Sequence, residues 1–184
     1  MRKIIFFIIS FLFIFSSVAS ACDFKISNFG DPKKDYSTMK IPVDGGVLPM
    51  IPPVIMPDQF GGEIVFIPTE DICVNEKSLY GTVIDYLYVD NKLVQITISR
   101  SLMNDKNLLD YAMKKFGSFN LPKGIKKIDW RGNYNWESGN DDIQYISADM
   151  DGSQIEILQI NSKLYADLMQ EYRERIIEWL EPKN

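Results

Sequence analysis

The sequence of 184 residues is long enough for one domain with a substantial hydrophobic core, and 46% of its residues are hydrophobic. Its formal net charge of −5 argues against a basic surface of the kind that binds nucleic acid or anionic lipid. The chain contains no histidine, which excludes Ser-His-Asp and Cys-His catalysis and removes the commonest zinc ligand.

The first 21 residues have the order of a cleavable signal peptide. Arg2 and Lys3 precede an apolar run from Ile4 to Phe15, and Ala19-Ser20-Ala21 supplies the small residues that signal peptidase accepts. The alternative is a retained membrane anchor, but a span needs about 20 apolar residues, which this run reaches only by counting the cleavage-site residues. We therefore expect a periplasmic or secreted protein. Arg2 and Lys3 are the only charged residues of the leader, so its removal changes the formal net charge of the protein from −5 to −7.

Two cysteines, Cys22 and Cys73, follow the leader. An even number of cysteines in an oxidising compartment predicts a disulfide, here closing a loop of about 50 residues and contributing roughly 4 kcal/mol on a chain-entropy model. The alternative is that Cys22, directly after the small residues, is the acylated first residue of a lipoprotein. A membrane is expected as a partner only in that second case.

Residues 22–62 are interpreted as an N-terminal segment tethered by this disulfide, and residues 63–184 as the globular body of the same domain. Five of the nine prolines lie between Pro42 and Pro57, a density that argues against a helix interior or a central strand. We expect an extended apolar strap, either buried across the core of the domain or exposed to a partner. The candidate partner residues of this strap are Leu48, Met50, Ile51, Val54, Ile55 and Met56.

Several elements are predicted downstream of Gly61-Gly62. Residues 63–67 read as a strand, and residues 82–89 and 93–99 read as a hairpin with its turn at 90–92. A helix begins after Asn104 or Asp105 and ends before Gly117. Residues 125–130 are a further candidate strand. A second hairpin joins 143–150 to 154–160 through Asp151-Gly152, and an amphipathic helix spans 162–180.

This order of elements predicts an α+β fold. We expect an antiparallel sheet of about five strands with two helices packed on one face, preceded by the Pro-rich strap.

A segment rich in aromatic and amide side chains is a candidate ligand platform. Flat rings beside amides can bind a sugar or a peptide, because the rings bury apolar area while the amides hydrogen-bond the polar edges. The alternative is that the two tryptophans are core residues of neighbouring strands joined by a turn. The candidate platform residues are Trp130, Asn133, Tyr134, Asn135 and Trp136.

The acidic residues Asp141, Asp142, Asp149 and Asp151 lie close together in the sequence. They do not fit a calcium-binding EF-hand loop, which would place Leu158 where a bidentate glutamate is required. We predict no metal, no cofactor and no catalytic residue. A carboxylate pair about 5 to 9 Å apart would nevertheless permit glycosidase-like chemistry.

The sequence thus predicts an exported, non-catalytic binding module whose partner is an unknown protein or envelope component and not a nucleic acid. The alternatives are a small carboxylate-dependent hydrolase acting on envelope polymers, or a secreted enzyme inhibitor. A hydrolase should place two acidic side chains in one cleft, whereas a binding module should show an apolar or aromatic surface without convergent carboxylates.

Overall fold

The computed structural model describes residues 22, 24–36, 40–43, 46–49, 53–101 and 105–181, and only the backbone of 40–43 and 46–49. The expected signal peptide lies outside the described residues, as do Met50, Ile51 and the side chain of Leu48 in the strap. The strands are β1 (Lys40–Val43), β2 (Gly46–Pro49), β3 (Val54–Pro57), β4 (Gly62–Pro68), β5 (Val83–Val89), β6 (Lys92–Ser101), β7 (Gly132–Ser138), β8 (Asp141–Met150) and β9 (Ser153–Ser162). The helices are α1 (Asn107–Phe116) and α2 (Ala166–Leu180).

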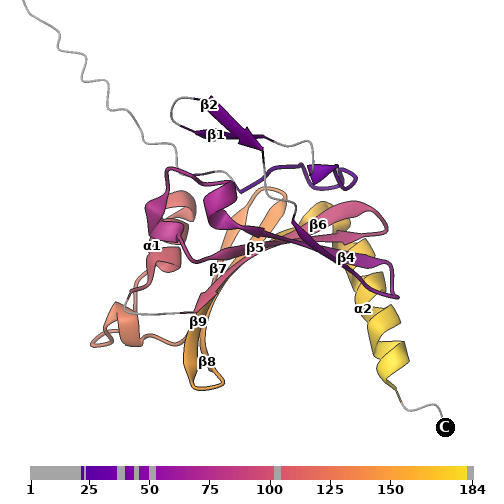
Figure 1. Ribbon diagram of the computed structural model, residues 1–184. Coiled ribbons are helices and arrows are strands. Elements are labelled where there is room, and N and C mark those ends of the chain that lie inside the picture. Colours follow the sequence, from indigo (N-terminus) through magenta and orange to yellow (C-terminus); the bar gives the residue numbers. More distant parts are fainter. Residues whose placement is uncertain are drawn as a thin grey trace, which may run out of the picture.

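The main sheet has seven antiparallel strands in the order β3-β4-β5-β6-β9-β8-β7, and β1 and β2 form a separate hairpin (Figure 1). The predicted α+β class is confirmed, and the five best-defined predicted strands appear as β4, β5, β6, β8 and β9. The expected count of about five is too low because β3 and β7 extend the two edges of the sheet. β3 comes from the Pro-rich strap, and β7 comes from the segment interpreted as a ligand platform.

The strand predicted at 125–130 is wrong. A turn and a short 3-10 helix over Lys127–Asp129 occupy this segment. Its sequence has neither regular alternation nor a run of β-branched residues, so nothing in it favours a strand over a turn.

Both predicted hairpin turns are present. Asp90 and Asn91 have φ values of 47° and 60°, and Asp151 and Gly152 have φ values of 50° and 78°. Two central residues in the left-handed region define the two-residue turn whose twist matches that of the flanking strands.

The sheet is strongly curved, and its convex face carries the main core (Figure 1). Apolar side chains at alternate positions of the strands meet α1 and the N-terminal segment 24–36 on this face. The largest side chains are tied by hydrogen bonds, because Tyr86 donates to the carbonyl of Phe24 at 2.6 Å and the hydroxyls of Tyr36 and Tyr88 lie 2.5 Å apart. The buried core of the sheet comprises Val65, Ile67, Ile84, Tyr86, Tyr88, Leu93, Ile96, Ile98, Ile143, Tyr145, Leu158 and Ile160.

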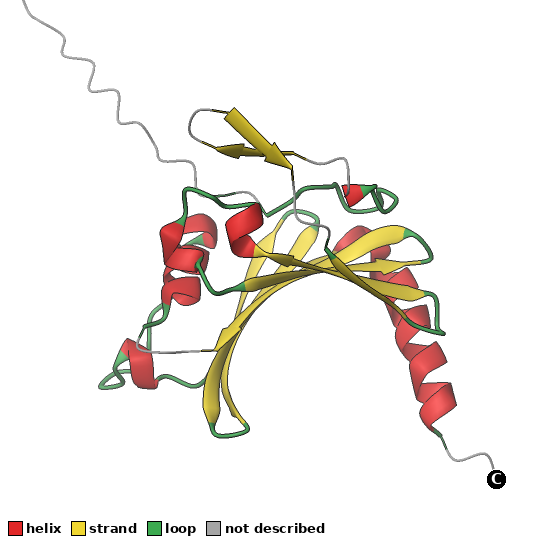
Figure 2. Cartoon of the chain, in the orientation of Figure 1, coloured by secondary structure: helices red, strands yellow, loops and turns green. Residues whose placement is uncertain are grey.

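The two helices lie on opposite faces of the sheet, so the expectation that both cover one face is wrong. α1 packs into the convex-face core, whereas Met169 and Tyr172 of α2 form a second, smaller core with Val89 and Val94. Figure 2 shows α1 outside the curve of the sheet and α2 beside one end of its inner side. The apolar stripe of an amphipathic helix shows that the helix needs cover, but not which side of a sheet provides it.

The predicted disulfide is confirmed. Cys22 is bonded to Cys73 across 51 residues, with the two Cα atoms 5.5 Å apart. The carbonyl of Cys22 also accepts a hydrogen bond from the hydroxyl of Tyr111 in α1, at 2.6 Å. Because the Cys22 sulfur is used in the disulfide, it is not available for a thioether-linked lipid.

Within the described ranges, neither helix has the length and apolar character that crossing a membrane requires.

Candidate binding site on the concave sheet face

The concave face of the sheet is covered only at one end. α2 contacts it at Val89 and Val94, near the β5–β6 turn. Further along the strands, Ile146, Ile155 and Ile157 point to this face, remain partly exposed and belong to neither hydrophobic cluster. The rest of the concave face is therefore open among the residues that the structure describes (Figure 2).

Polar side chains of five strands stand opposite one another on this open face. Each of these residues directly faces the next one on the neighbouring strand, in the order β5, β6, β9, β8 and β7. Neighbouring strands are about 4.8 Å apart, so the row offers one polar group at each such step. This first row consists of Asp85, Thr97, Gln159, Gln144 and Asn135.

A second row lies two residues along each strand, about 7 Å from the first. It consists of Gln95, Asn161, Asp142 and Glu137 on four neighbouring strands. We refer to these two sets of residues as the amide rows, because five of their nine side chains are amides.

Most amides of these rows have unused hydrogen-bonding capacity. The Gln95 side chain donates to Thr97 Oγ1 at 2.8 Å. The side-chain amides of Gln144, Gln159 and Asn161 have no hydrogen-bond partner among the described residues, and the Asn161 oxygen is buried. Each primary amide offers two donors and an acceptor, so the open face presents a dense set of unpaired polar groups.

Asp85 carries a carboxylate near the middle of the curved sheet. Burial raises the pKa of this carboxyl to about 6 because desolvation disfavours the charged form. Its Oδ1 atom is buried and accepts no hydrogen bond from any described residue. A carboxylate that is partly desolvated and unpaired lowers the stability of the folded state. Groups of this kind are often found at functional sites.

Two hollows lie along the amide rows and share Asp142 and Asn161. The larger, of about 310 Å³, lies over β7, β8 and β9, and the smaller, of about 160 Å³, lies between the second row and α2. The wall of the smaller hollow on the helix side includes Met169 and Arg173. Together they form a depression that leads from the β7 edge to α2.

One pair of carboxylates faces the larger hollow. Glu137 and Asp142 are directly opposite each other on β7 and β8, and both line it. The Asp142 side chain is 61% exposed and forms an ion pair with Lys163 at 3.1 Å. A general acid is typically held in a partly buried site, and these two side chains are exposed. The geometry supplies two carboxylates but not the environment of an acid catalyst.

The predicted platform residues do not share one face of the sheet. Trp130 and Trp136 are buried in the convex-face core, and Tyr134 stacks on Phe119 with ring centroids 4.2 Å apart. Both tryptophans are core residues, as in the alternative interpretation, but Trp130 follows a 3-10 helix and does not belong to a strand. Asn133 and Asn135 alternate with these rings and point to the concave face, so the rings and amides do not form one surface.

The last part of the Pro-rich strap, Val54–Pro57, is an exposed edge strand of the main sheet. Val54, Ile55 and Met56 are 62%, 42% and 51% exposed, and β3 pairs only with β4. Binding of a partner to this strap remains a prediction.

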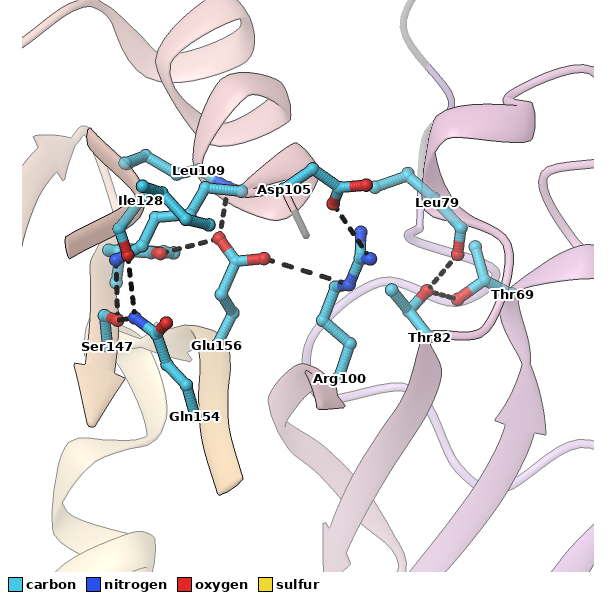
Figure 3. Close-up of polar contacts among 12 residues, drawn as sticks. Thr69, Leu79, Thr82, Arg100, Asp105, Leu109, Ile128, Ser147, Gln154 and Glu156 are labelled. Carbon is cyan, nitrogen blue, oxygen red and sulfur yellow. Dashed lines mark hydrogen bonds and ion pairs between the residues drawn. The ribbon is translucent and has the colours of Figure 1, made fainter. Parts of the chain in front are cut away.

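A second cluster of polar residues lies inside the convex-face core (Figure 3). Glu156 on β9 is fully buried, accepts a hydrogen bond from the Leu109 amide of α1 at 3.0 Å, and lies 3.8 Å from Arg100. Arg100 also forms an ion pair with Asp105 at 3.0 Å. Burial raises the pKa of Glu156, while the hydrogen bonds from Tyr145 and Leu109 and the charge of Arg100 oppose this effect. The cluster holds the first turn of α1 against the sheet.

Lys106 and Ser147 form another part of this cluster and resemble a nucleophile with its base. Lys106 Nζ donates to Ser147 Oγ at 2.7 Å, and burial lowers the pKa of Lys106 to about 8. Lysine with such a pKa can act as a general base. However, the two side chains are only 1% and 2% exposed, and Ser147 Oγ also accepts a hydrogen bond from Gln154 at 3.1 Å. A serine closed off in this way cannot reach a substrate, so we interpret the pair as structural.

No group of three or more acidic, cysteine or histidine side chains in the described part of the chain could hold a metal ion. Comparison with known proteins finds no matching family model, no similar curated protein and no similar solved structure.

Sequence reasoning missed the amide rows, although a signal for them was present. Gln95, Thr97 and Ser99 alternate with apolar residues in β6, and Gln144 and Gln159 occupy equivalent positions in β8 and β9. On an ordinary solvent-facing surface such positions are often charged. Amides repeated on three strands could have indicated a binding face, but only the strand order shows that they are adjacent.

Proposed function

We propose that this protein is an exported, non-catalytic binding module of the cell envelope or the secreted fraction, and that its ligand lies on the concave face. The observation that carries this proposal is the pair of amide rows, an open face with unpaired polar groups and a continuous depression. Binding sites are typically concave and combine apolar surface with a few polar groups that fix orientation. The Cys22–Cys73 disulfide supports a location in an oxidising compartment.

The destabilising carboxylate of Asp85 also supports this assignment. A face that only met solvent would have no need of an unpaired acid with a buried carboxylate oxygen at one end of its first amide row. A ligand that donates hydrogen bonds to Asp85 would replace the water lost on folding.

Affinity capture tests this proposal. We would immobilise residues 22–184 and incubate them with an envelope extract and the secreted fraction of the producing cell. The matched variants are Gln159→Arg, which blocks the first amide row, and Gln170→Arg, which makes the same change on the exposed side of α2. We expect a component that the wild type and Gln170→Arg retain and that Gln159→Arg loses, with all three giving the same circular dichroism spectrum. Equal capture by the two variants, or no capture at all, would contradict the proposal.

A carboxylate-dependent hydrolase is the second candidate, because Glu137 and Asp142 line one hollow. The expected result under our proposal is that the wild type releases no new reducing ends or fragments from envelope polymers. Turnover that is lost in both Glu137→Gln and Asp142→Asn would favour the hydrolase instead.

A further inference from the structure

We infer that the ligand of the concave face is a neutral oligosaccharide that lies along the amide rows, across the strands. This inference rests on the proposed function, because it names the chemistry of the ligand that the same face would bind.

The charges of the amide rows disfavour an anionic ligand. The amide rows include the carboxylates of Asp85, Asp142 and Glu137 and contain no lysine or arginine. Two basic side chains lie beside the second row: Lys163 is paired with Asp142 at 3.1 Å, and Arg173 lines the smaller hollow with Asp142 and Asn161. A phosphorylated or uronic-acid polymer would therefore meet uncompensated negative charge, whereas a neutral ligand would not.

The hydrogen-bonding groups match vicinal hydroxyls. A hydroxyl both donates and accepts, and a planar amide presents a donor and an acceptor side by side. Gln144 and Gln159 face each other at the centre of the first row, with no described partner for either side-chain amide. Asp85 at the end of the row can accept a strong charge-assisted bond from a hydroxyl.

Apolar side chains flank the first row and can contact sugar ring faces. Phe66 stands directly opposite Asp85 at one end of the row, and it is only partly buried. Ile146 and Ile157 face each other two residues along the strands, on the side away from the second row. Rings and aliphatic groups beside polar groups bury the apolar faces of a sugar while the amides bind its edges.

The direction of the rows favours a chain that lies across the strands. Each strand places a polar group about 4.8 Å from the next, so a repeating polymer meets similar groups at successive units. An extended peptide would instead obtain most of its affinity from main-chain hydrogen bonds at a sheet edge, which the amide rows do not offer.

Nuclear magnetic resonance titration of isotope-labelled residues 22–184 tests the inference. The probes are neutral hexasaccharides (cellohexaose, maltohexaose and chitohexaose), the anionic hexagalacturonate, and an uncharged extended peptide of similar length. We expect at least one neutral hexasaccharide to shift the side-chain amide signals of Gln144, Gln159 and Asn161. The double variant Gln144→Ala/Gln159→Ala should bind it about tenfold or more weakly, since two hydrogen-bonding groups are lost, whereas Gln170→Ala should bind normally.

The outcomes separate this inference from the proposed function. If no neutral hexasaccharide binds, or if the double variant binds it as well as the wild type, the inference is overturned. If only the peptide or hexagalacturonate shifts these amide signals, the ligand class is wrong but the concave face remains a binding face. If the capture experiment also yields no partner that depends on Gln159, the proposed function fails as well.

Discussion

Replacing Asp85 by asparagine should stabilise the protein above about pH 6 and have little effect near pH 4. The pKa of Asp85 rises from 3.8 to about 6 on folding because the carboxylate loses water. The folded state therefore binds the proton more tightly than the unfolded state. Stability attributable to this group falls as the pH rises from about 4 to about 6, and then stays constant.

The size of the effect follows from the shift. Two pKa units correspond to about 3 kcal/mol, which is an upper bound because Asp85 retains partial contact with solvent. We expect Asp85→Asn to gain about 1 to 2 kcal/mol in free energy of unfolding at about pH 7.5. The melting temperature should rise by about 2 to 8 °C.

Urea denaturation followed by circular dichroism at several pH values between about 4 and 8 measures this gain. Asp151→Asn, at an exposed hairpin turn, serves as the control because it removes the same charge from the surface. If Asp85→Asn destabilises the protein at pH 7.5, or if its gain does not depend on pH, the account of a desolvated and unpaired carboxylate is wrong. A gain in stability together with weaker ligand binding would fit a functional residue.

Three further changes test the structural framework. Glu156→Ala should lower the free energy of unfolding by about 3 to 5 kcal/mol, because it removes the buried acid beside Arg100 and leaves the Leu109 amide and the Tyr145 hydroxyl without their acceptor. Glu156→Gln should lower it less, and equal losses in urea titrations would argue against an electrostatic role. Replacing Cys22 and Cys73 together by serine should lower the free energy of unfolding by about 4 kcal/mol. The denaturation midpoint should fall and should no longer change when a reductant is added. A midpoint equal to that of the oxidised wild type would refute this prediction. Gly30→Ala should lower the free energy of unfolding by about 1 to 3 kcal/mol. Gly30 has a φ of 88°, and an added Cβ would overlap the Tyr165 side chain. An unchanged melting temperature would contradict this prediction.

Local sequence patterns were sufficient for most of the central sheet. The Asp90-Asn91 and Asp151-Gly152 turns and the alternation within β6 carry their information in a few adjacent residues. The disulfide was also accessible, since only two cysteines could pair.

The features that the sequence did not reveal depend on contacts between distant residues. The start of α1 is an example, because its Leu109 amide is bonded by Glu156, 47 residues away, and not by a capping side chain at its N-terminus. The edge strand β3 forms only because β4 provides a partner for a proline-rich segment. The amide rows arise from the adjacency of β6 and β9, whose facing residues Thr97 and Gln159 are far apart in the chain. No local pattern contains this adjacency.

The position of Cys22 determines how the molecule can be attached to a surface for binding experiments. Its disulfide to Cys73 and its hydrogen bond from Tyr111 fix it beside α1, on the convex side. A biotin or fusion partner joined immediately before Cys22 would therefore leave the concave face of the sheet directed into solution.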